Sequence, residues 1–67
     1  MWTVVYIAPN RTVAERLKAV LENEGILTNL HSLEADESGR GSVELLVPEG
    51  EAEEAHEVLT EHLGGLK

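Results

Sequence analysis

The stretch WTVVYIAPN, residues 2–10, decides the fold, because a short run rich in β-branched and aromatic residues ends there at a proline. Such a run favours a β-strand, and Pro9 ends it because proline has no N–H to donate to a sheet. Alternation along a strand over residues 2–8 makes both of its sides apolar. One side carries Thr3, Val5 and Ile7, and the other carries Trp2, Val4, Tyr6 and Ala8.

A helix follows this strand. Thr12 and Glu15 have the spacing of a capping box, in which each side chain bonds to the other residue's backbone N–H, and Asn10 is a second candidate for the N-cap. Apolar residues then recur at helical spacing until Gly25, which suits the left-handed position after a helix end. We expect a helix from Thr12 to Glu24.

The rest of the chain again shows strand and helix patterns that end at proline or glycine. Residues 26–33 (ILTNLHSL) read as an edge strand with poor alternation, and residues 34–41 (EADESGRG) read as a polar connection. Residues 42–47 (SVELLV) predict a third strand, closed by Pro48. Residues 51–63 predict a second helix, with Glu53, Glu57 and Glu61 spaced four apart on its outer face.

The order β-α-β-β-α predicts an α+β, ferredoxin-like split β-α-β domain spanning residues 1–67. The crossover and the hairpin together give a three-stranded antiparallel sheet of order 1-3-2, with both helices on one face. The predicted core consists of Val5, Ile7, Leu17, Val20, Leu21, Val43, Leu45, Val47, Ala55 and Leu59.

The composition narrows the classes of partner. Thirteen acidic and five basic residues give a formal net charge of −8, which disfavours nucleic acids and anionic membranes as partners. Cysteine is absent, which leaves no disulfide and no thiolate metal site. The start of the chain has neither a secretory leader nor a membrane-spanning run, and we expect a cytoplasmic protein.

Residues able to carry chemistry are present but are not arranged as in known sites. No serine lies in a G-x-S-x-G setting and no phosphate-binding glycine motif occurs. Glu53 and His56 have the spacing of a di-iron helix, but the motif is not repeated and its further glutamates are not placed. We therefore expect no enzyme, no cofactor and no metal site. Arg40, in the turn Gly39–Gly41, is a weak candidate for binding an anion.

The first strand suggests an interface. If one side of the sheet is covered by helices, then Trp2, Val4, Tyr6 and Leu46 lie on the open face, where they form a candidate protein interface. Local packing of these residues is the alternative. Sheet order 1-3-2 also leaves the first strand at an edge, so we expect a homodimer or a protein partner to pair there. The alternative is that residues 64–67 fold back and cover that edge within one chain.

Four segments resemble a known family: VYIAPN at residues 5–10, LENEGI at 21–26, VELLVPE at 43–49 and AEEA at 52–55. Together they are similar to the prokaryotic signal-transducing protein family, a group of short bacterial domains of unknown function. The resemblance covers nearly the whole chain and implies a ferredoxin-like fold likened to the nitrogen-regulatory PII (GlnB-like) superfamily. It carries over no catalytic residues. We expect a non-enzymatic regulatory or adaptor domain that binds protein, with a small-ligand sensor of the ACT or PII type as the alternative.

Overall fold

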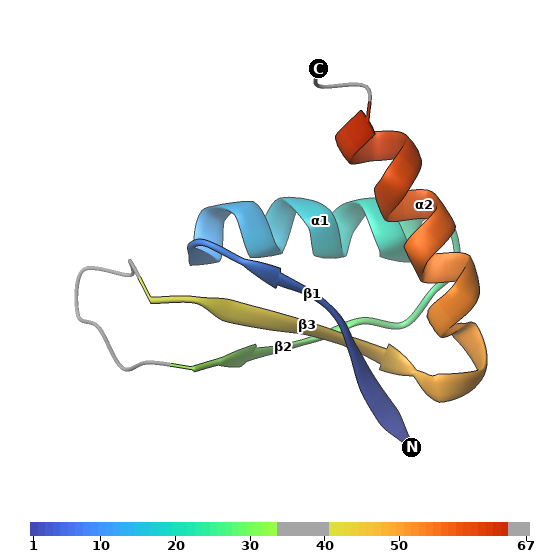
Figure 1. Cartoon of the computed structure of the whole chain (residues 1–67), viewed down its shortest axis with the longest axis horizontal. Helices are drawn as coiled ribbons and strands as arrows, with labels where there is room; N and C mark the ends of the chain where they lie inside the picture. Colours follow the sequence, from blue (N-terminus) through green and yellow to red (C-terminus); the bar gives the residue numbers. More distant parts are fainter. Residues whose placement is uncertain (34–40, 65–67) are drawn as a thin grey trace.

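A computed structural model describes residues 1–33 and 41–64 of the chain. Figure 1 shows the predicted order β-α-β-β-α, with a short 3₁₀ helix added before the second α-helix. The elements are β1 (Trp2–Ala8), α1 (Arg11–Asn23), β2 (Asn29–Ser32), β3 (Val43–Pro48), η1 (Glu49–Glu51) and α2 (Ala52–Gly64).

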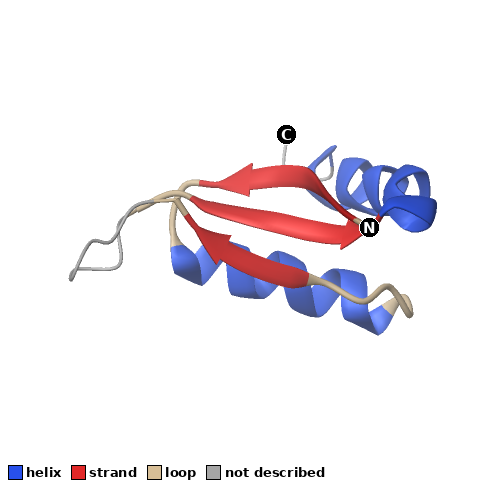
Figure 2. Ribbon diagram, turned by 90° about the horizontal axis from the view of Figure 1, so that it is seen from below, coloured by secondary structure: helices blue, strands red, loops and turns tan. Residues whose placement is uncertain are grey.

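The three strands form one sheet of order β1-β3-β2, and β3 is antiparallel to both of its neighbours. The strands β1 and β2 therefore run parallel to each other, and α1 connects them across the sheet. Both helices lie on the same side of the sheet, and no element among the described residues covers its other side, which we call the open face (Figure 2). The predicted α+β, ferredoxin-like arrangement is confirmed.

The strand β1 contains a β-bulge that the sequence pattern does not show. Val4 lies opposite Leu46, but the next paired residue, Tyr6, lies opposite Leu45, so Val5 is an extra residue in β1. A bulge of this kind reverses the alternation of the residues that follow it. The prediction that Ile7 belongs to the core is wrong, because Ile7 lies opposite Glu44 on the open face.

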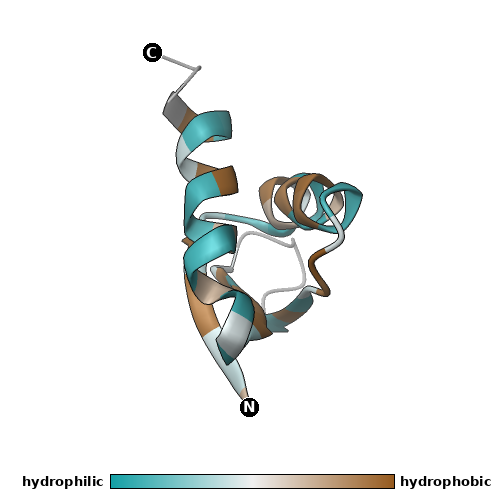
Figure 3. Ribbon diagram, turned by 90° about the vertical axis from the view of Figure 1, so that its right-hand side faces the viewer, coloured by the Kyte–Doolittle hydropathy of each residue, from teal (hydrophilic) through white to brown (hydrophobic). Residues whose placement is uncertain are grey.

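The core lies between the sheet and the two helices, and in Figure 3 hydrophobic segments of α1 and α2 face each other. Its buried residues are Val5, Ala8, Ala14, Leu17, Leu21, Ile26, Val43, Leu45, Val47, Ala55 and Leu59. Eight of these were predicted. Val20 was also predicted but is only half-buried, whereas Ala8, Ala14 and Ile26 were missed. Ala8 is buried because the bulge turns it to the helix side.

The ends of α1 are fixed by local hydrogen bonds. The Val13 N–H donates to Asn10 Oδ1 at 2.9 Å, which makes Asn10 the N-cap. The capping box of Thr12 and Glu15 is therefore wrong, and Glu15 instead lies 3.7 Å from the Arg11 guanidinium. At the other end the Ile26 N–H donates to the Leu21 carbonyl at 3.0 Å. Gly25 permits this turn with φ of 85°.

The strand β2 is shorter than the predicted strand over residues 26–33. Ile26 and Thr28 are buried ahead of it, and the Thr28 hydroxyl donates to the Ile26 carbonyl at 3.1 Å. That bond keeps a polar side chain satisfied inside the core. The regular ladder with β3 begins only at Asn29.

Candidate protein interface

The open face of the sheet carries an apolar strip made by β1 and β3. We call Trp2, Val4, Ile7 and Leu46 the open-face strip. Register places these residues together, because Val4 lies opposite Leu46, Trp2 opposite Pro48, and Ile7 opposite Glu44. Alternate residues of β3 (Val43, Leu45 and Val47) are buried on the other side. The strip is well exposed to solvent, with 44% of Trp2, 39% of Val4 and 52% of Ile7 accessible.

The structure brings together three of the four interface residues predicted from the sequence. Trp2, Val4 and Leu46 lie on the open face, and Tyr6 does not. Tyr6 lies opposite Leu45, is half-buried and packs against the core. Ile7 takes its place on the open face. No signal in the sequence could have indicated this exchange, because β1 is apolar on both of its sides.

Polar groups border the open-face strip on the β2 side. His31 Nδ1 lies 3.1 Å from Glu44 Oε1, and these two residues are paired across β2 and β3. Asn29, opposite Leu46, is exposed next to them. An exposed pair of this kind contributes about 1 kcal/mol or less to stability. The strip therefore has an apolar centre and a polar margin, as protein interfaces do.

The outer edge of β1 pairs with no strand among the described residues. The Glu49 N–H donates to the Met1 carbonyl at 2.8 Å, so the backbone of Met1 bonds toward the β3 side. Ladder bonds on one side of an antiparallel strand occur at alternate residues, so Trp2 and Val4 turn their backbone N–H and C=O groups to the free edge. No charged residue and no internal proline blocks this edge.

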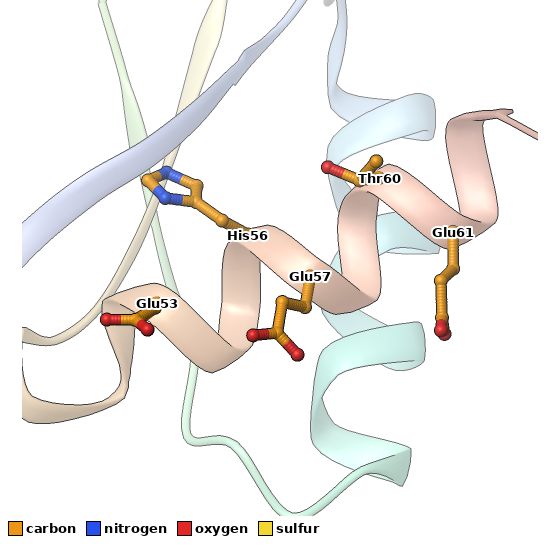
Figure 4. A pocket seen from close by; sticks show the side chains of 5 residues that line it. All are labelled: Glu53, His56, Glu57, Thr60 and Glu61. Atoms are coloured by element: carbon orange, nitrogen blue, oxygen red, sulfur yellow. The ribbon is translucent and has the colours of Figure 1, made fainter.

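The helix α2 stands on the β1 side of the molecule, where it packs on β1 and β3. Its outward side has a shallow hollow lined by Glu53, His56, Glu57, Thr60 and Glu61. These residues recur at helical spacing and are all exposed, as the four-residue spacing of the glutamates predicted. Figure 4 shows the five side chains that line the hollow, and of these His56 points toward β1. We call Glu53, Glu57 and Glu61 the acidic side of α2.

Polar groups elsewhere serve the fold. The Arg11 guanidinium donates to the Ser32 hydroxyl at 3.0 Å, which ties the start of α1 to the end of β2. Within residues 1–33 and 41–64, no three His, Asp or Glu side chains come close enough together to hold a metal ion. His56 and His62 are on α2, while His31 is on β2. Arg40, the candidate for anion binding, lies outside the described residues.

Comparison with known proteins does not identify a family for this chain. No protein-family model matches the chain, and neither the curated proteins nor the solved structures contain a match. The resemblance to the prokaryotic signal-transducing protein family therefore stays a prediction. Among the described residues, neither helix has both the length and the apolar composition that crossing a lipid bilayer requires.

Proposed function

We propose that this chain is a regulatory or adaptor domain that binds another protein through the open-face strip and the adjoining free edge of β1. The observation that carries the proposal is the exposure of Trp2, Val4 and Ile7 on one uncovered face of the sheet. Scattered exposed apolar residues are ordinary, but a contiguous apolar patch with a polar margin is typical of interaction sites.

Burial of the open-face strip would stabilise a complex. Each Å² of apolar surface removed from water contributes about 25 cal/mol, and tryptophan is among the residues most enriched in interfaces. The side chains of the strip come from two adjacent paired strands, so their relative positions are fixed before binding. A preformed surface loses little conformational entropy when it binds, which favours affinity.

The experiment that tests this function compares capture of proteins by variants of the full chain. The wild type and the double variant Trp2→Ser, Ile7→Ser are immobilised and exposed to an extract of the source cells. Leu27→Ser is the matched control, because Leu27 is also exposed but precedes β2 and lies outside the open-face strip. We expect a protein that the wild type and the control retain and the double variant loses.

Binding is then measured with the captured protein after purification. Trp2 is the only tryptophan of the chain, so its fluorescence should shift to shorter wavelength when a tryptophan-free fragment of the partner covers it. A captured protein that binds the double variant as tightly as the wild type would show that the open-face strip is not the contact surface. A rise in Tm of several degrees with one nucleotide or amino acid, and no captured protein, would favour a small-ligand sensor instead.

A further inference from the structure

We propose that the partner presents apolar side chains together with one lysine or arginine, and that this cation pairs with the carboxylate of Glu44 beside the open-face strip. This inference rests on the proposed function, since it names the chemistry of the partner at the same surface. The open-face strip supplies the apolar contact, and Glu44 distinguishes between partners.

Glu44 is the only residue of the three strands that carries a formal charge at neutral pH. Its side chain is on the open face, because Val43 and Leu45 on either side of it are buried on the helix side. Register places Glu44 between Ile7 of β1 and His31 of β2. A single carboxylate therefore lies beside the apolar strip, where a docked partner covers it.

The carboxylate of Glu44 has one partner among the described residues. Its Oε1 atom lies 3.1 Å from His31 Nδ1, whereas Oε2 has no such partner and is reached by solvent. The Glu44 side chain is only 21% exposed, and the His31 side chain is 68% exposed. Glu44 therefore keeps one carboxylate oxygen available to a donor from another molecule.

A partner that covers this face takes Glu44 out of water. A carboxylate loses its hydration when it is buried, and only an opposite charge or new hydrogen bonds compensate for that loss. The contact with His31 reaches Oε1 and leaves Oε2 without a donor. A lysine or arginine supplies the charge and the donors together. Charge therefore favours a partner with one cation at this position over a partner that is apolar throughout.

The register of β3 determines where the cation lies relative to the apolar contacts. Leu46 is opposite Val4, and Glu44 is opposite Ile7. Leu46 and Glu44 are two residues apart on one face of β3, which corresponds to about 6.6 Å along the strand. Alternate side chains of an extended segment have the same spacing, so such a segment can place an apolar residue over Leu46 and its cation on Glu44.

A second copy of this chain fits the open face poorly. The basic residues among the described ones, Arg11, Arg16 and Lys18, all lie on α1, which is on the other side of the sheet (Figure 2). Two open faces packed against each other would therefore place two Glu44 carboxylates in one interface without a lysine or arginine. Like charges oppose such pairing, so charge complementarity favours a different protein as the occupant.

Two capped peptides, Leu-Ser-Leu-Ser-Arg and Leu-Ser-Leu-Ser-Gln, test the inference with the full chain. Alternation places both leucines and the last residue on one side of an extended peptide. Each peptide is titrated to about 10 mM into the ¹⁵N-labelled protein, which detects a Kd of about 1 mM. We expect the arginine peptide to bind about fivefold more tightly than the glutamine peptide. It should perturb the amide signals of Ile7, Glu44 and Leu46.

Glu44→Gln tests the role of the carboxylate, because glutamine keeps the shape of the side chain and a hydrogen-bonding group for His31. This variant should bind the arginine peptide about fivefold more weakly than the wild type does and should not distinguish the two peptides. Glu57→Gln is the matched control, since Glu57 is on the acidic side of α2 and points away from β1 (Figure 4). The same loss of charge there should change the affinity by less than about twofold.

Three results would overturn the inference. They are equal affinity of the wild type for both peptides, a preference for the arginine peptide that survives Glu44→Gln, and the absence of perturbed amides on β1 and β3. A dimer of the protein alone that perturbs the same amides would also overturn it, because the occupant would then be a second copy.

The protein captured in the experiment on the proposed function separates the two proposals. Weaker binding of that purified protein to Glu44→Gln than to the wild type supports the inference. Tighter binding to Glu44→Gln would show a contact surface that is apolar throughout, because a neutral amide loses less hydration than a carboxylate. The inference would then be wrong, while the proposed function stands. If the purified protein binds the Trp2→Ser, Ile7→Ser variant as tightly as the wild type, the proposed function itself fails.

Discussion

Tyr6 lies directly opposite Leu45 on the helix-covered side of the sheet, although strict alternation from Val4 would place it opposite Glu44. The single extra residue, Val5, thus decides which aromatic side chain of β1 supports the core and which remains available for binding. Tyr6 packs against the core, and Trp2 stays on the open face.

Substitutions on either side of the bulge should therefore have unequal effects on stability. Tyr6→Ala removes a half-buried ring from the core and should lower the free energy of unfolding by about 2–3 kcal/mol. Ile7→Ala should cost less than about 1 kcal/mol, because about half of Ile7 is exposed to water. Urea unfolding of the two variants measures the difference. The reverse order would mean that β1 alternates without a bulge.

The bulge shows where prediction from the sequence ends. The strand, its length and its place at the edge follow from the composition of residues 2–8 and from the handedness of β-α-β connections. The bulge does not follow, because alternation reveals a slip only when one side of a strand is polar. Both sides of β1 are apolar, so the pattern of apolar and polar residues is the same whether Tyr6 or Ile7 faces the helices.

The core at Leu17 and Leu59 should be the most sensitive part of the fold. Both side chains are buried between the helices and the sheet, and truncation to alanine should cost about 2–5 kcal/mol through lost burial and the cavity it leaves. A domain of this size has only about 5 kcal/mol of stability in total, so either variant should be partly unfolded by circular dichroism. The control Leu27→Ala, on an exposed side chain, should remain folded. Losses below about 1 kcal/mol at both core positions would contradict the described packing.

The N-cap of α1 can be identified by a pair of substitutions. Asn10→Ala removes the acceptor of the Val13 N–H bond and should destabilise the protein by about 1 kcal/mol. Thr12→Ala should change stability little, because Thr12 is exposed inside the helix and its side chain has no hydrogen bond among the described residues. Thermal unfolding of both variants gives the comparison. A larger loss for Thr12→Ala would restore the capping box predicted from the sequence.

Gly25 holds the turn after α1 in a left-handed conformation. Its φ is 85°, and an added Cβ would meet open space, so Gly25→Ala should cost about 1–2 kcal/mol through backbone strain alone. Gly50→Ala is the matched control, because Gly50 has equally open surroundings without a positive φ. Denaturant midpoints of the two variants measure the cost. Equal stability of the two would show that residue 25 does not need a positive φ.

The full chain alone should be a monomer of 7.3 kDa at low salt. The reason is that each chain carries a formal net charge of −8, and like charges oppose association. Multi-angle light scattering at several concentrations determines the mass. A dimer that disappears in Trp2→Ala would show that apolar burial outweighs the charge.

The candidate site was only partly foreseeable, for reasons that differ between its parts. The outward position of Glu53, Glu57 and Glu61 follows from their four-residue spacing and from the apolar stripe on the other side of the helix. The place of α2 over β1 and β3 depends on packing between the helix and the sheet, which the periodicity of the helix does not give. Ile26 falls within the strand predicted over residues 26–33, whereas in the structure it is buried after the turn at Gly25 and before β2 starts.

The central place of β3 has a consequence for the order of folding. The strands β1 and β2 each pair with β3 and not with each other, so the first 42 residues can form α1 but none of the strand pairs described here. During synthesis both edges of β1 therefore stay unpaired until the ribosome has released residues 43–48. In that interval any other extended chain can compete with β3 for β1, because both edges of β1 are then equally open to pairing.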